Sequence, residues 1–220
     1  IESIYAFAQV NGYLPCPAWQ DDIADPTPTV TSNGLECRNS DATPANCDSF
    51  PPVATDECDV WYGYVPAKTL GLAGKYSDIN QLLLDPWGMP YRYQVTVDAN
   101  VVGTSSGDGN FVIPDDMRNA GIVNLAPDLA VCNTTTLLTT ACTGGAPNTV
   151  VSGLPVVIHS TGKDRGLVSS GPQDENLDNA ADVVFVKTTF NSSGAQFDDL
   201  IKWVSPNVLY SKMIDAGRLP

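Results

Sequence analysis

The chain opens with IESIYAFAQVNGYLPCP, residues 1–17, and this stretch decides how the fold begins. Its apolar residues recur at the spacing of one helix face: Ile1, Ile4, Tyr5 and Ala8. Gly12 is a natural helix end because glycine adopts the left-handed backbone conformation without steric cost. Pro15 then stops any continuation, since proline has no amide proton to donate. We therefore expect residues 1–12 to be the end of a helix that begins upstream of Ile1.

The opposite end of the chain carries the clearest helix signals. Ser205 precedes Pro206, which predicts a capping hydroxyl followed by proline at the first helical position. Gly217 stands where the glycine that ends a helix belongs. An apolar stripe lies between these signals: Val208, Leu209, Met213 and Ile214. We expect a short C-terminal helix there.

Between the two helices the sequence alternates in the manner of β-strands. YRYQVTV, residues 91–97, is rich in aromatic and β-branched residues. Further strands are expected at 110–113, 122–125, 155–159 and 182–187, and 197–204 is expected to pair with or pack on the sheet. No helix-length periodic segment separates these strands, so we predict an α+β fold with an antiparallel meander.

The organisation expected from these signals is one domain, residues 1–220. It comprises the helix end at 1–12, a loop region at 13–60, and the sheet with its C-terminal helix at 61–220. The loop region is rich in proline and contains four of the six cysteines. A loop of this length needs covalent restraint.

Six cysteines and no CxxC pair favour three disulfides and an oxidising compartment. Spacing alone leaves several connectivities open. We favour one short bridge and two nested ones: Cys132 with Cys142, and Cys37 with Cys47 inside Cys16 with Cys58. The single histidine makes a zinc site a poor alternative.

The charge balance excludes whole classes of partner. The chain has 25 acidic and 11 basic residues, a formal net charge of −14. Binding to nucleic acid or to anionic membranes requires lysine and arginine, so neither is expected. The acidity suits a solvated extracellular surface or a divalent cation.

Catalytic patterns are missing from the sequence. His159 is the only histidine, and its neighbour Ser160 would point to the opposite face of a strand. There is no GxSxG elbow and no phosphate-binding glycine loop. Carboxylate pairs for glycoside hydrolysis remain open, because only geometry can identify them. We expect a structural histidine and no enzyme.

An acidic stretch at 174–182 is the one candidate metal site. It places oxygen ligands at alternate positions, as calcium loops do, although it departs from the EF-hand pattern at Asn179 and Phe185. An ordinary solvated loop is the alternative. The candidate ligands of a structural calcium are Asp174, Asn176, Asp178 and Asp182.

Several segments resemble type IV pilins and the pseudopilins of type II secretion, in particular their cysteine-containing minor members. The most specific is the tail, FDDLIKWVSPNVLYSKMIDAGRLP at 197–220. The other matching segments are GYLPCP at 12–17, DPWGMPY at 85–91, and residues 65–66, 70–72 and 175–185. The resemblance implies a pilin-like head in which an N-terminal helix packs on an antiparallel sheet. It also implies a basic leader and an apolar membrane-spanning helix ahead of Ile1, and related pseudopilins hold a calcium near the C-terminal sheet.

The function implied by the resemblance is that of a filament subunit. Such a subunit is anchored in the inner membrane with a periplasmic head, and then assembles with other pilin subunits through its N-terminal helix. The extracellular filament would serve adhesion, motility or secretion, and its stapled loops could contact a surface or glycan ligand. A secreted adhesin or binding module outside any filament is the alternative, and an extracellular hydrolase comes third.

Overall fold

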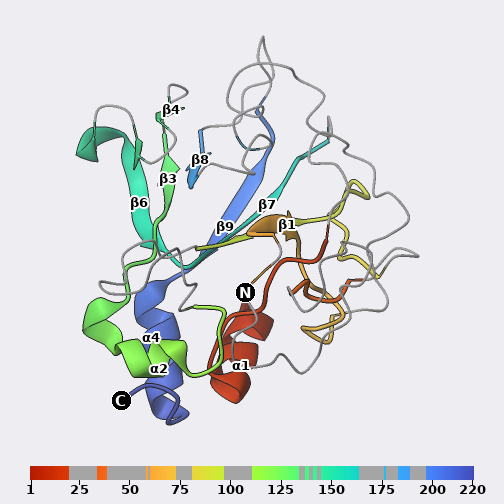
Figure 1. Ribbon diagram of the computed structural model, residues 1–220. Helices are drawn as coiled ribbons and strands as arrows, with labels where there is room; N and C mark the ends of the chain where they lie inside the picture. Colours follow the sequence, from red (N-terminus) through yellow and green to blue (C-terminus); the bar gives the residue numbers. More distant parts are fainter. Residues whose placement is uncertain are drawn as a thin grey trace.

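The computed structural model confirms an α+β fold with antiparallel sheets (Figure 1). It describes these residues: 1–19, 34–38, 58, 60–72, 81–96, 111–133, 137–138, 141–142, 145–163, 176, 183–188 and 197–220.

The main sheet has four antiparallel strands. Their spatial order is β1 (Tyr62–Tyr64), β2 (Arg92–Val95), β7 (Val156–Ser160) and β9 (Leu200–Val204). A second sheet has the order β6 (Thr149–Leu154), β3 (Leu129–Cys132) and β8 (Val184–Val186). A short hairpin joins β4 (Leu137–Leu138) to β5 (Ala141–Cys142).

The predicted meander is wrong in its connectivity. Strand β2 pairs with β7, although β3 to β6 lie between them in the chain, and β3 pairs with β8 in parallel. The strands expected at 155–159, at 182–187 and within 91–97 are confirmed, and β9 pairs with β7 as expected of 197–204. Strands β3 and β6 were not predicted.

Two predicted strands are wrong. The described part of 110–113 forms buried turns, and Ile122–Asn124 is a 3₁₀ helix. Between them lies helix α2 (Asp116–Ala120). The apolar run at 111–113 is buried because it packs in the main core, which also contains Ile4 and Tyr5 of α1, and the Phe111 carbonyl accepts the N–H of Leu14 at 2.6 Å. The apolar composition of 111–113, which suggested a strand, reflects the burial of these residues and not strand pairing.

Helix α1 (Glu2–Asn11) ends as predicted at Gly12, whose φ is 85° and whose N–H bonds the carbonyl of Ala8 at 2.8 Å. Helix α4 (Pro206–Asp215) begins at the expected proline, and Gly217 has a φ of 70°.

Two details of the α4 prediction are wrong. Ser205 occupies the N-cap but its hydroxyl makes no capping bond. Only half of the apolar stripe faces the core: Leu209 and Met213 are buried, whereas Val208 and Ile214 are 41% and 44% exposed.

Helices α1, α2 and α4 gather at one end of the molecule, below the strands in Figure 1. The main core lies between them and one face of the main sheet, and includes Ile4, Tyr93, Val156, Val204 and Met213. The other sheet face packs on a second apolar cluster that contains Leu129, Phe185 and Ile201. Among the described residues, no helix has both the length and the apolar character needed to cross a membrane.

Candidate functional site

Helices from the two ends of the chain are joined side by side. The Tyr5 hydroxyl accepts a hydrogen bond from the backbone N–H of Ser205 at 3.1 Å. The Gln9 amide donates to the carbonyl of Lys212 at 3.2 Å, and Arg218 donates to the carbonyls of residues 9 and 10. Helix α1 is therefore fixed to α4 by polar contacts as well as by its buried apolar face.

Disulfide bonds restrain the segment that follows α1 and also link β3 to β5. The predicted Cys16–Cys58 and Cys132–Cys142 bonds are confirmed. Cys37 is also disulfide-bonded, and Cys47, its predicted partner, lies outside the described residues.

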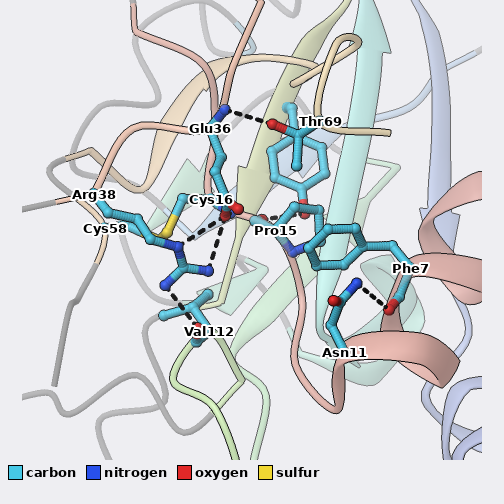
Figure 2. Close-up of polar contacts among 10 residues, drawn as sticks. Phe7, Asn11, Pro15, Cys16, Glu36, Arg38, Cys58, Thr69 and Val112 are labelled. Carbon is cyan, nitrogen blue, oxygen red and sulfur yellow. Dashed lines mark hydrogen bonds and ion pairs between the residues drawn. A yellow bond between two sulfur atoms is a disulfide. The ribbon is translucent and has the colours of Figure 1, made fainter. Parts of the chain in front are cut away.

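A buried ion pair lies beside the Cys16–Cys58 bond, as Figure 2 shows. The Arg38 guanidinium contacts Glu36 Oε2 at 2.9 Å and donates to the Val112 carbonyl at 2.8 Å. The same carboxylate oxygen accepts the backbone N–H of Cys16 at 3.1 Å. The Arg38 side chain also lies over the ring of Tyr13, 4.8 Å from its centroid. This arrangement ties residues 36–38 to both the N-terminal segment and the core.

The electrostatics of this pair are set by burial. Glu36 and Arg38 are 2% and 1% exposed. Desolvation raises the pKa of Glu36, and the neighbouring Arg38 charge opposes that rise. Desolvation, reinforced by the Glu36 charge, raises the pKa of Tyr13 to about 12. The pair belongs to the folded scaffold, because both groups are closed off from solvent.

His159 is fully buried inside the main sheet. Its Nε2 lies 3.1 Å from the Tyr62 hydroxyl, and that hydroxyl donates to the Asn176 carbonyl at 3.3 Å. Since the hydroxyl has one proton, we assign the histidine proton to Nε2. Desolvation, aided by the charge of Arg92, lowers the pKa of His159 to about 3. The ring is therefore neutral at ordinary pH.

Of the four predicted calcium ligands the structure describes only Asn176. Asp174, Asp178 and Asp182 lie outside the described residues. The buried Asn176 side chain accepts the N–H of Val186 at 2.8 Å and donates to its carbonyl at 3.0 Å. It also donates to Asp199 at 2.8 Å. Asn176 thus closes the edge of β8, and its amide oxygen already has one donor. The calcium site stays a prediction.

The sequence analysis missed three polar residues that organise the structure. Glu36 and Arg38 form the buried pair, and Asp85 accepts the N–H groups of Trp87 and Met89 and the hydroxyl of Ser160. The sequence Asp85-Pro86-Trp87-Gly88 has the composition of a turn, in which aspartate commonly accepts a backbone N–H two residues on. No local signal marked Glu36 or Arg38, whose contacts are mostly distant in sequence.

The donors and acceptors of these clusters join chain segments, and among the residues described above no group of three or more His, Cys, Asp or Glu could hold a metal ion. Comparisons with protein-family models, with curated proteins and with solved structures find no match to the chain. Its function must therefore be argued from its own residues and contacts.

Proposed function

We propose that this chain is the extracellular head of a filament subunit of the type IV pilin or pseudopilin class, with a structural and not a catalytic role. Helix α1 carries the proposal. Its inner face buries Ile4 and Ala8, whereas its outer face exposes Ala6 and Val10, the latter by 66%. One face of this helix packs on its own domain, and the other face exposes apolar groups. Such a helix is suited to pack against neighbouring subunits.

The attachment of α1 to the rest of the head supports the same role. A filament built through one helix of each subunit must transmit force from that helix to the head. The polar contacts with α4 and the buried aromatic ring of Tyr5 provide this connection from both ends of the chain. The same subunit would be anchored in the inner membrane before assembly.

The braced region after α1 supports an exposed, extracellular setting. Each disulfide restrains the unfolded chain and typically contributes about 2–4 kcal/mol of stability. Such bonds persist outside the reducing cytoplasm. We further propose that the loop region predicted from the sequence at 13–60 contacts a surface or glycan ligand, because binding residues concentrate on loops held by a rigid scaffold.

The first test is the coding sequence upstream of Ile1. The proposal expects a basic leader ending in glycine, followed by an apolar segment of membrane-spanning length. A cleaved secretory signal peptide there would refute the filament role and favour a secreted adhesin. Deletion of the gene should then remove or shorten surface filaments, scored by electron microscopy together with motility and secretion.

The second test is a pair of exposed valines. Val10→Glu places a charge on the outer face of α1, and Val123→Glu places the same charge on a side chain that is 97% exposed in the 3₁₀ helix. Both variants should fold, as circular dichroism can verify. Only V10E should abolish filament assembly at equal subunit levels. Normal filaments in V10E would overturn the role of this helix face.

A further inference from the structure

A cavity of about 280 Å³ lies on the face of the main sheet that packs against α1. Its lining includes Ile158 of β7 and Lys202 of β9, which are partners in the strand register and therefore point to the same face. Ile4 of α1 lines it as well. Because Lys202 is exposed to solvent, the cavity reaches the surface of the molecule.

Most of the lining is apolar. Leu70, Leu83, Tyr91 and Ile158 pack against the main core, yet each keeps part of its side chain exposed. An apolar group that fills the cavity would remove this surface from water, which is favourable. The volume lies just below the usual range of ligand pockets, so it is suited to one aliphatic chain of about eight carbons.

The polar side chains of the described lining can all donate hydrogen bonds. They are the ammonium group of Lys202 and the hydroxyl groups of Ser3 and Tyr91. Burial, followed by the charge of Asp85, raises the pKa of Tyr91, so this hydroxyl keeps its proton at ordinary pH. Three donors and an aliphatic surface favour a ligand whose polar end accepts hydrogen bonds.

The sign of the charge at the cavity is set by Lys202. It is the only charged side chain among the described lining residues, and it forms no ion pair with any of the residues that the structure describes. The opposing charge nearby is that of Asp85, which is 6% exposed and is not a lining residue. Its carboxylate already accepts two backbone N–H groups and the hydroxyl of Ser160. A negatively charged end of a ligand is therefore favoured at Lys202.

We propose that this cavity binds a free aliphatic monocarboxylic acid. The alkyl chain lies against Leu83 and Ile158, and the carboxylate lies at the ammonium group of Lys202. The volume admits one short chain and not the two long chains of a membrane lipid. The inference uses this cavity only, and it does not depend on the filament role.

The experiment titrates the folded, oxidised chain with octanoate, butanoate and octylammonium, followed by NMR chemical shifts of the isotope-labelled protein. Octanoate should bind saturably and show nuclear Overhauser contacts with the methyl groups of Leu83 and Ile158. Each buried methylene should tighten binding by about fourfold, so butanoate should bind at least about tenfold more weakly. Octylammonium, which has the same chain and the opposite charge, should bind more weakly than octanoate.

Lys202→Glu tests the role of the charge. It should weaken octanoate binding by on the order of tenfold and make octylammonium the tighter ligand, since it replaces attraction by repulsion at an exposed site. Lys163→Glu is the matched control, because Lys163 is also exposed and does not line the cavity. It changes the net charge by the same amount and should leave both affinities unchanged.

Four results would overturn the proposal. They are the failure of octanoate to saturate, equal affinity for octanoate and octylammonium, contacts of the bound chain outside the cavity, and equal weakening by K163E and K202E. The last result would assign binding to the overall charge of the protein and not to this cavity.

Discussion

Acid should unfold this protein partly through its single histidine. His159 is fully buried, hydrogen-bonded to Tyr62, and close to the ring of Phe185 at a centroid distance of 5.6 Å. Protonation would place a charge in this enclosure beside the positive charge of Arg92, which is the second cause of its low pKa. The perturbation we consider is His159→Gln, which removes the titrating group and keeps a polar side chain.

The magnitude follows from the linkage between protonation and folding. The pKa of an unfolded histidine is about 6.5, and that of His159 in the fold is about 3. Because the folded pKa is lower, the stabilisation is complete above the unfolded pKa and is lost as the pH falls toward the folded pKa. Each pH unit in this window is worth about 1.4 kcal/mol, so a fall from about pH 7 to about pH 4.5 costs about 2.5 kcal/mol.

The assay is urea unfolding of both proteins at these two pH values, with the disulfides intact and tryptophan fluorescence as the probe. Carboxylates titrate in both proteins, so the difference between their pH dependences isolates the histidine. Wild type should lose about 2–3 kcal/mol more than H159Q over this interval. Proton NMR provides a direct check, because the one imidazole signal should not titrate until the pH falls well below 6. Parallel stability curves, or an imidazole that titrates normally, would refute the buried, neutral assignment.

Four further outcomes are expected. Arg38→Met should lower the free energy of unfolding by about 3–5 kcal/mol in urea titrations, because it leaves a buried carboxylate without its partner; a loss below about 1 kcal/mol would contradict the ion pair. Replacing Cys16 and Cys58 by serine should cost about 4 kcal/mol for a separation of 42 residues, measured the same way, and an unchanged midpoint would contradict the restraint. Ser205→Ala should change stability by less than about 0.5 kcal/mol, since its hydroxyl makes no capping bond; a loss near the usual 1 kcal/mol in thermal melts would show otherwise. If calcium occupies the predicted loop, chelation should lower Tm by several degrees, and identical melting curves would exclude it.

Local signals predicted the elements at the two ends of the chain. The glycine at position 12 and the proline at 206 act through their own backbone restrictions, so their effects hold in any fold. Strand β7 was predicted from its β-branched run, and in the structure this run is both mostly buried and paired with neighbouring strands. The run at 111–113 has similar composition, yet it lies in turns, because composition reports burial and not pairing.

The pairing of strands depends on distant partners, which single-sequence patterns do not specify. Strand β3 is flanked by β6 on one side and β8 on the other, one antiparallel and one parallel. Its LAVC sequence is short and apolar throughout, with no alternation to suggest a strand. The same limit applies to Asn176, whose amide completes the edge of β8 from outside the sheet.

Glu36 and Arg38 are the clearest case, since two charged residues near a proline-rich loop would ordinarily be assigned to the surface. Their neighbours compensate part of the cost of desolvation: the N–H of Cys16 and the guanidinium meet one carboxylate oxygen, and Val112 accepts another guanidinium proton. One of these donors belongs to a disulfide-bonded residue. The Cys16–Cys58 bond therefore restrains the chain and also positions the N–H that Glu36 needs, so the disulfide and the ion pair should stabilise the fold cooperatively and not additively.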